Sequence, residues 1–277
     1  MTKREVGLST KVITISSGKG GVGKTNVVVN LAVSLARLGK KVVVLDADLG
    51  LGNIDVLLGL APRYNLGHFL RGEKLLEEIM TEGPCGIRII PAASGLEELT
   101  RLTLEHKLLL ISNLENLNEK ADYLLIDNAA GISENVLFFS IAASEIIVVA
   151  SPDPTSIVDA YAFIKVLNLK YGEKRFRLLV NMAKTAEEGL GVYKNISLVA
   201  GRYLNISLDY LGHIAYDEKV RRAVREQKPV CELYTTSAAK QGFLELARNV
   251  CEFPPTETKE NIHILMNAGP TDNLAIV

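Results

Sequence analysis

Cysteine is scarce in this sequence, and its scarcity argues against two kinds of architecture. The three cysteines, Cys85, Cys231 and Cys251, lie far apart and form no C-x-x-C pair. The sequence therefore supports neither a disulfide framework nor a cysteine-rich metal site. We interpret the cysteines as small buried side chains of a protein that works in a reducing compartment.

Long hydrophobic runs and an excess of charge of either sign are also missing. The N-terminus, MTKREVGLSTK, lacks the apolar core of a secretory signal, and the most apolar window, 136–150, is too short to span a bilayer. Lysine and arginine (31) nearly balance aspartate and glutamate (32), so the chain as a whole does not attract nucleic acid or an anionic membrane. We expect a cytoplasmic protein, and the sequence leaves peripheral attachment to the inner face of the cell membrane open.

Short apolar runs alternate with longer amphipathic stretches, which predicts an α/β fold with a parallel sheet covered by helices on both faces. We predict one domain over residues 1–252, with a mostly parallel sheet of about seven strands, and a tail, 253–277, that is weakly ordered or docks on a surface. The candidate strands are 12–16, 41–45, 87–91, 123–127, 145–150, 176–181 and 208–214, and the candidate helices include 27–38, 104–117, 155–169 and 238–250.

The first candidate strand runs into a glycine-rich loop that precedes a helical pattern. The loop sequence GKGGVGKT matches the phosphate-binding pattern G-x-x-x-x-G-K-[ST] in its required strand–loop–helix context. Glycines let backbone N–H groups surround phosphate oxygens, Lys24 is expected to contact the β- and γ-phosphates, and the Thr25 hydroxyl is expected to bind Mg²⁺. The fold class is therefore that of a single-domain P-loop NTPase. The predicted nucleotide-binding residues in this region are Gly18, Lys19, Gly20, Gly21, Val22, Gly23, Lys24, Thr25 and Asn26.

A second lysine, Lys19, lies at the start of this loop. With it, the segment resembles the deviant phosphate loop, K-G-G-x-G-K-T, of the MinD/ParA family of ATPases. In that family the corresponding lysine reaches across a dimer interface to the phosphates held by the other subunit. The resemblance therefore implies a homodimer formed with ATP and catalytic roles for Lys19 and Lys24. The alternative is a solvated surface lysine in an ordinary nucleotide loop.

Two further segments resemble the switch regions of this family. The run DADLGLGN resembles D-x-D-x-G-x-x-N, and by this match Asp48 is a catalytic residue that orients or activates water while Asp46 helps to hold Mg²⁺. Asp48 could instead cap the following helix. Asp127 ends the run YLLID as a Walker B aspartate does, and it is expected to hold Mg²⁺ through a water. The next residues, 128–131, read NAAG where flagellar members have T-G-A-G, which bears on the hydrolysis rate more than on binding.

The base is predicted from residues near two later strands. A guanine-specific N-K-x-D or T-K-x-D run is absent. Asn181 matches the asparagine that contacts adenine in the family, and Tyr216 and Asp217 lie in a segment similar to the loop that closes over the base. An asparagine at a strand end is also common without such a role. The resemblance favours ATP and ADP with Mg²⁺ as the ligands.

One segment favours a particular branch of the family. Residues 150–161, ASPDPTSIVDAY, resemble the T-x-P-E-P-T-S-x-x-D-A-Y run of FlhG-like (FleN/YlxH) flagellar regulators more than the MinD segment. This implies a slow ATPase switch that regulates flagellum number or placement through a FlhF-like GTPase or a flagellar switch protein. The N-terminal D-Q-A-x-x-L-R run of such proteins is absent, and residues 261–277 lack the lysine or arginine of a membrane-binding helix.

Other functions remain as alternatives. A MinD-like division-site ATPase would share the same motifs. A ParA-type DNA-partition ATPase needs a basic patch, and Arg221, Arg222 and Arg225 form only a small cluster, so the sequence argues against a nucleic-acid partner. A cluster-carrier ATPase needs paired cysteines and a bacterial tyrosine kinase needs a tyrosine-rich tail, neither of which is present.

Overall fold

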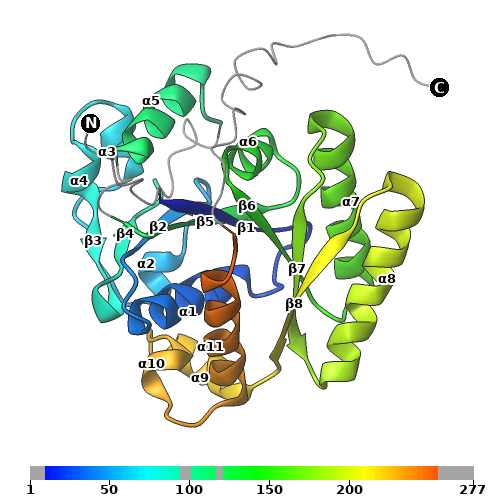
Figure 1. The fold of residues 1–277 in the computed structure, drawn as a ribbon. Coiled ribbons are helices and arrows are strands. Elements are labelled where there is room, and N and C mark those ends of the chain that lie inside the picture. The colour runs from blue at the N-terminus through cyan, green and yellow to red at the C-terminus, as the bar shows by residue number, and fades with distance from the viewer. Residues whose placement is uncertain (1–9, 94–100, 117–120, 255–277) are drawn as a thin grey trace, which may run out of the picture.

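The computed structural model describes residues 10–93, 101–116 and 121–254. These contain the strands β1 (Lys11–Ser17), β2 (Val42–Ala47), β3 (Thr81–Glu82), β4 (Arg88–Ile90), β5 (Tyr123–Ala130), β6 (Glu145–Ala150), β7 (Phe176–Ala183) and β8 (Leu208–Ala215). They form one twisted sheet in the order β3-β4-β2-β5-β1-β6-β7-β8, which runs through the middle of the molecule (Figure 1). Neighbouring strands are parallel except for the antiparallel pair β3 and β4.

The predicted α/β class is confirmed, and each candidate strand is present with small shifts of its ends. The strand that the sequence did not indicate is β3, which has only two residues. Such a short strand cannot show the alternation by which strands are found in a sequence. The sheet therefore has one more strand, at its edge, than the predicted seven.

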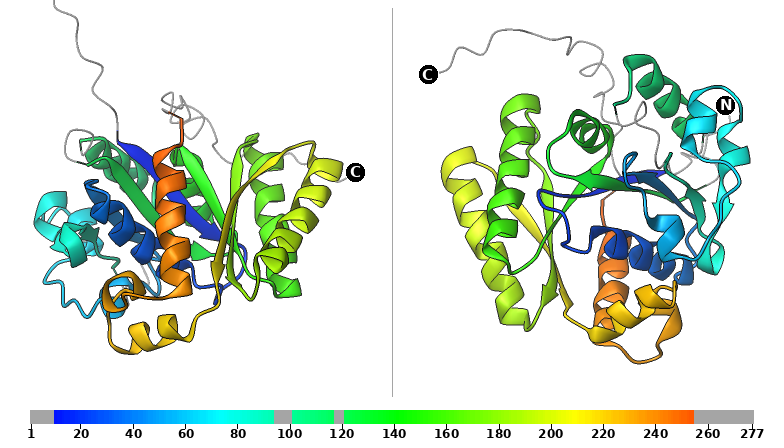
Figure 2. Two further views of the ribbon diagram at one scale, coloured as in Figure 1. Left: turned by 60° about the horizontal axis from the view of Figure 1, so that its bottom comes forward. Right: turned by 180° about the vertical axis from the view of Figure 1, so that it is seen from behind.

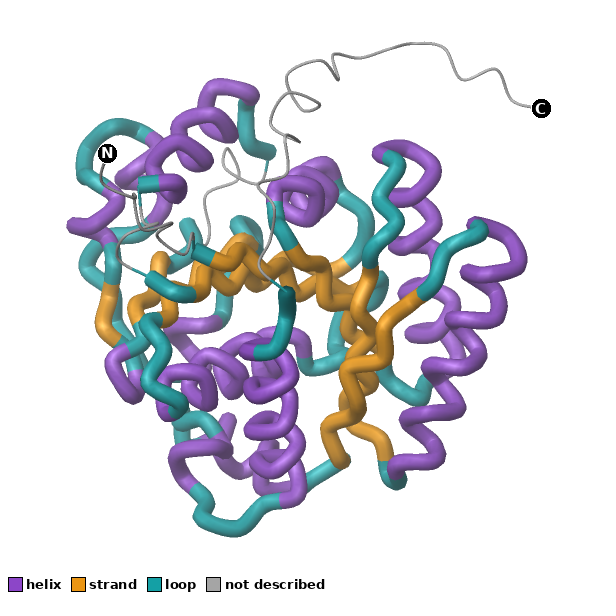
Figure 3. The backbone as a smooth tube through the Cα atoms, in the orientation of Figure 1, coloured by secondary structure: helices purple, strands orange, loops and turns teal. Residues whose placement is uncertain are grey.

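Helices cover both faces of the sheet, as the tube in Figure 3 and the two views of Figure 2 show. One face carries α1 (Lys24–Arg37), α2 (Ile54–Leu57), α9 (Glu218–Arg225), α10 (Val230–Leu233) and α11 (Ala238–Cys251). The other face carries α3 (Leu66–Leu70), α4 (Leu76–Ile79), α5 (Leu104–Glu115), α6 (Glu134–Ala142), α7 (Pro154–Tyr171) and α8 (Ala186–Leu204). A short 3₁₀ turn, η1 (Pro84–Gly86), precedes β4.

The central strands have apolar side chains on both faces, and this explains their unbroken apolar sequences. In β5, Leu125 packs in the core beneath α1 and α11, whereas Leu124 and Ile126 pack in the core beneath α3 to α6. Full burial of such a side chain stabilises the fold by about 1.5–3 kcal/mol. A polar residue on either face of this strand would need its own hydrogen-bond partners.

This arrangement brings the residues of the predicted site together at the carboxyl ends of the parallel strands. The carboxyl ends of β1, β2, β5 and β7 meet there, where ligands bind in open parallel sheets. The last described helix, α11, ends at Cys251, one residue before the predicted end of the domain. The tail beyond Pro254 lies outside the described residues, so the prediction made for it stays a prediction. None of the described helices is both long enough and apolar enough to cross a membrane.

Candidate functional site

The loop between β1 and α1 is held against the protein at its two ends and open in its middle. A Cβ added to Gly18 would lie 2.0 Å from the backbone oxygen of Asp159 in α7, so only glycine fits there. Gly23 has a φ of +80°, and a Cβ added to it would lie 2.5 Å from Nδ2 of Asn181. A Cβ added to Gly20 would meet nothing within 4 Å. The middle of the loop therefore leaves room for a ligand to approach the backbone closely.

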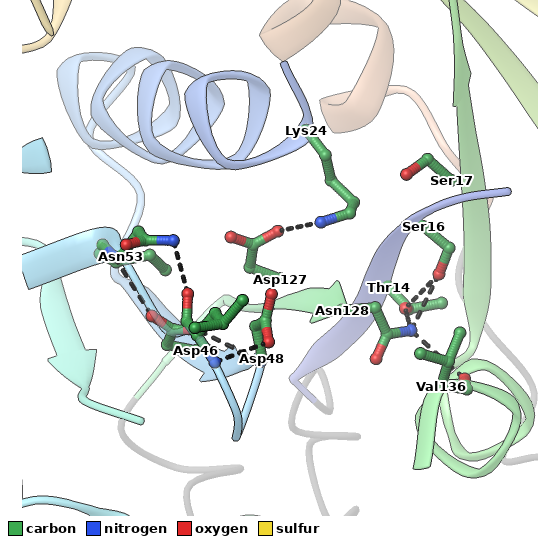
Figure 4. A network of polar contacts seen from close by, with 12 residues as sticks. Thr14, Ser16, Ser17, Lys24, Asp46, Asp48, Asn53, Asp127, Asn128 and Val136 are labelled. Atoms are coloured by element: carbon green, nitrogen blue, oxygen red, sulfur yellow. Dashed lines mark hydrogen bonds and ion pairs between the residues drawn. The ribbon is translucent and has the colours of Figure 1, made fainter. Parts of the chain in front are cut away.

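The two lysines of the loop have different surroundings. Lys24 begins α1, is 9% exposed, and places its Nζ 3.3 Å from Oδ1 of Asp127 (Figure 4). Lys19 is partly exposed, and its Nζ forms an ion pair of 3.3 Å with Asp153 and a hydrogen bond with the Thr155 hydroxyl at the start of α7. Hydrogen bonds, first that from the Thr155 hydroxyl, hold the pKa of Asp153 at about 2, so this carboxylate is charged at neutral pH. Lys24 thus lies inside the site and Lys19 lies on the surface.

Two buried carboxylates lie beside Lys24. Asp46 in β2 and Asp127 in β5 are directly paired in the sheet register and are 2% and 1% exposed. Burial and the charge of Asp127 raise the pKa of Asp46 to about 8. Burial also raises the pKa of Asp127, although Lys24 and the Thr25 hydroxyl act in the opposite direction. The raised pKa values show that the surrounding positive charge does not fully compensate two buried carboxylates. A bound cation would supply the missing charge.

These residues fit Mg²⁺ as a partly solvated ion. The described residues contain no cluster of three or more His, Cys, Asp or Glu side chains that could hold a metal. Mg²⁺ does not require such a cluster, because it usually keeps several waters and takes other ligands from phosphate oxygens. The residues predicted to hold it, Thr25, Asp46 and Asp127, are near neighbours at the carboxyl ends of β2 and β5 and the start of α1.

Asp46 also holds the first switch segment in place. Its Oδ1 accepts a hydrogen bond from the backbone N–H of Asp48, and its Oδ2 accepts one from Ile54, the first residue of α2. Asp48 accepts a hydrogen bond from the backbone N–H of Leu51 and remains partly exposed. The bond to the start of α2 therefore comes from Asp46 and not from Asp48, which differs from the capping alternative considered for Asp48.

Asn128 follows Asp127 in β5, and its side chain turns to the opposite side of the strand (Figure 4). Its Nδ2 lies 2.8 Å from the hydroxyls of Thr14 and Ser16 in β1 and 3.2 Å from the hydroxyl of Ser140 in α6. The first of the two residues that depart from the flagellar pattern, Asn128, thus belongs to a buried polar cluster between β1, β5 and α6, and the second is Ala129. Asn128 does not face the side on which Lys24 and Asp127 meet.

A pocket of about 260 Å³ opens beside the phosphate loop, and most of its lining is apolar. The structure brings together here five residues that the sequence predicted for nucleotide binding, which are Gly23, Asn26, Asn181, Tyr216 and Asp217. Sequence reasoning missed the rest of the lining, chiefly Met182, Ile214, Val220, Arg221 and Phe243. These residues belong to four elements that only the fold brings together, and no local motif marks them.

Asn181 presents a fixed hydrogen-bonding group to the pocket. Its Nδ2 donates to the backbone oxygen of Val22 at 2.8 Å, which leaves Oδ1 to accept a hydrogen bond. The exocyclic amine of adenine is a donor, whereas guanine carries an oxygen at the same ring position. The amide orientation therefore favours adenine.

Both carboxylate oxygens of Asp217 accept hydrogen bonds from the protein itself, so this side chain is not a free carboxylate beside the nucleobase. Its Oδ1 accepts a hydrogen bond from the backbone N–H of Lys219 and caps α9. Its Oδ2 accepts hydrogen bonds from the Ser237 hydroxyl at 2.6 Å and from the backbone N–H of Ala239 at 3.4 Å, both at the start of α11. Asp217 thus joins two helices and fixes the position of the preceding Tyr216, which lines the pocket.

Replacing Asn181 with alanine is expected to lower the affinity for ATP by roughly tenfold or more. The affinity for GTP should stay nearly unchanged, because the Asn181 side-chain oxygen accepts a hydrogen bond from the amine of adenine, and guanine has no donor at that position. Competition of ATP and GTP against a fluorescent ADP analogue measures both. Asn113→Ala, in which an α5 amide bonded to the Leu109 carbonyl is removed, is the matched control. Equal losses for ATP and GTP would show that Asn181 does not select the base.

A glycine loop between a parallel strand and a helix, a buried lysine facing a strand-end aspartate, and an adjoining apolar pocket define a P-loop nucleotide-binding protein. Comparison with known proteins narrows this class. A family model described as an AAA domain matches residues 10–178. The antiactivator FleN of Pseudomonas aeruginosa is 45% identical over 244 residues, which cover 88% of this chain and 87% of FleN. The flagellum site-determining protein YlxH of Helicobacter pylori is 38% identical, with 86% of this chain and 81% of YlxH covered.

Solved structures agree with this assignment. The cell division protein MinD of Aquifex aeolicus has a TM-score of 0.72 and 27% identity, with 90% of this chain and all of that chain covered. MinD of Pyrococcus horikoshii, solved with Mg-ADP, has a TM-score of 0.71 and 26% identity, with 88% and 96% covered. The chain therefore belongs to the ParA/MinD family of P-loop ATPases, and it is an ATPase. The predicted family and activity are confirmed, whereas the roles of individual residues stay predictions.

Proposed function

We propose that the protein is an Mg-ATP-dependent switch that forms a homodimer with ATP and regulates flagellum number or placement through protein partners. The flagellar role is supported by the identity to FleN and YlxH, which exceeds the 30% identity to MinD of Bacillus subtilis. A MinD-like role in division-site selection is the second candidate, because the MinD structures share the fold over nearly the whole described chain.

The observation that carries the dimer is the position of Lys19. Its ammonium group lies with Asp153 and Thr155 on the surface, whereas Lys24 lies with Asp127 in the site. A loop lysine placed on the surface can meet the triphosphate of a second copy, as an arginine finger supplied in trans does. Each site would then be completed by the other copy, and hydrolysis would depend on dimerisation.

We assign the work of hydrolysis to a few residues of this chain. Thr25, Asp46 and Asp127 would hold Mg²⁺, which neutralises phosphate charge when it is bound. Lys24 binds the phosphates from inside the site. Asp48 orients the attacking water, and Asp46 keeps Asp48 in place through the backbone of the switch segment.

In this proposal a protein partner recognises and binds the ATP-bound dimer. We expect this partner to be a FlhF-like GTPase or a flagellar switch protein in the cytoplasm.

The DNA-binding alternative depends on the exposed cluster Arg221, Arg222 and Arg225 in α9. Binding to nonspecific duplex DNA at several salt concentrations tests it, because a basic surface would give ATP-dependent binding that falls steeply with salt. We expect no such binding.

Replacing Lys19 with alanine tests the dimer directly. We expect the ATP-induced dimer to disappear and turnover to fall by roughly 10²-fold, because a transition-state charge is removed from the opposite site. The affinity for ADP should stay within about twofold, since the ammonium group of Lys19 is paired with Asp153 and Thr155 and not with the groups around Lys24. Light scattering and phosphate release measure the two effects, with the exposed Lys40→Ala as control. An equal loss of ADP affinity would show instead that Lys19 acts within its own subunit.

A further inference from the structure

Met182 is held in an unusual backbone conformation beside the base pocket. Its φ is +61°, which is left-handed, and among the described residues it is the one non-glycine residue with such a φ that lies inside a strand. The other such residues in the described chain, Cys85, Asn205 and Gln227, lie in a turn or just after a helix. A left-handed conformation is strained for an apolar side chain, and strain of this kind persists where the surroundings enforce it, often at functional sites.

The strain arises from a β-bulge. Asn181 pairs with Ile214 and Ala183 pairs with Ala215, so Met182 is an extra residue in β7 without a partner in β8. In a regular strand, neighbouring side chains point to opposite faces of the sheet. At this bulge Asn181 and Met182 both line the same pocket.

The bulge also places the thioether near the phosphate loop. The Met182 Cε lies 3.0 Å from the position of a Cβ added to Gly23, and the residue is 38% exposed. The next residue, Ala183, accepts a hydrogen bond of 2.8 Å from the backbone N–H of Tyr216 in the loop over the pocket. One backbone irregularity therefore positions both a side chain and the loop at the pocket.

From this geometry we propose that Met182 packs against the ring of the nucleobase and is a further binding residue for the base of the nucleotide. The pocket wall is mainly apolar, and a polarisable sulfur makes favourable contacts with aromatic rings. In this proposal Asn181 forms a hydrogen bond with the edge of the base, while Met182 contacts the face of the ring. Two consecutive residues can do this because the bulge directs both side chains into the same pocket. The proposal rests on the nucleotide site proposed above.

Met182→Gly removes the side chain and keeps the backbone conformation of the bulge, because glycine adopts a left-handed φ without strain. We expect the affinity for ATP to fall roughly fivefold to tenfold, in proportion to a lost sulfur–aromatic contact, and the affinity for inorganic triphosphate to stay unchanged. Asn205→Gly makes the same kind of exchange at the left-handed residue that ends α8, and it should leave both affinities unchanged.

Oxidation supplies a measurement on the unaltered chain. Hydrogen peroxide transfers one oxygen to a methionine sulfur and leaves as water, and bound ATP should slow this reaction at Met182 but not at Met80. Wild-type affinity in Met182→Gly, equal losses for ATP and triphosphate, or unchanged oxidation with ATP would overturn the proposal. Each of these results leaves ATP binding by the wild-type chain intact, whereas a wild-type chain that binds no ATP would overturn the proposed function itself.

Discussion

Lys24→Ala is expected to abolish ATP turnover and to weaken ATP binding by roughly 10²–10³-fold. Lys24 is a nearly buried cation whose Nζ already faces Asp127 at the end of β5. In such a low-dielectric position one charge contributes far more than it would in water, and phosphate charge grows during transfer. Titration calorimetry with ATP and a phosphate-release assay measure the two losses. ATP binding at wild-type affinity would contradict the assignment of the phosphate loop.

This variant needs a check on folding, because Lys24 also compensates a buried charge. Burial raises the pKa of Asp127 and Lys24 lowers it, so removing Lys24 raises this pKa further. Asp127 can then take up a proton and remain buried as a neutral acid. We therefore expect a folded protein, which circular dichroism verifies. Lys40→Ala, at an exposed lysine just beyond α1, should keep full activity.

Asp48→Ala is expected to separate binding from hydrolysis. Turnover should fall by roughly 10²–10⁴-fold, the usual contribution of a group that positions or deprotonates a nucleophile. ATP binding should persist, because Lys24 and the phosphate loop are untouched, and the ATP-bound dimer should accumulate. Single-turnover phosphate release and light scattering with Mg-ATP measure both effects.

A matched control for Asp48 lies a few residues further along the chain. Asp55 in α2 accepts a hydrogen bond from the backbone N–H of Val56, and Asp55→Ala should hydrolyse ATP normally. An Asp48→Ala protein that stays monomeric with Mg-ATP would contradict the proposed dimer. If the dimer forms, the same variant loaded with ATP is the reagent of choice for capturing the partner protein from a cell extract.

The parts of the molecule that could be predicted are those set by contiguous residues. The strands are visible because their apolar runs are buried on both faces, as with Leu124 and Leu125 in β5. The phosphate loop is visible because its glycines, its lysines and Thr25 are neighbours in the chain. The strand β3 was missed because two residues carry no pattern.

The parts that could not be predicted depend on contacts between distant segments. The base pocket joins Gly23 to Ile214 and Phe243, and only the order of the strands brings these together. The bulge at Met182 depends on how β7 pairs with β8. The hydrogen bond to the start of α2 comes from Asp46 and not from Asp48, for which capping was the alternative role, because the side chain of Asp46 reaches Ile54 across the turn.

The bonds of Asp217 to Ser237 and Ala239 have a consequence for how this enzyme can change during evolution. In the proposed site the phosphates are bound by residues 18–26, whereas the loop beside the base is held by the start of α11, the last described helix. In the proposed site, substitutions at the start of α11 would alter how Tyr216 lies against the base and leave the affinity for phosphate intact. In this proposal, base binding and phosphate binding can therefore change independently on the same scaffold.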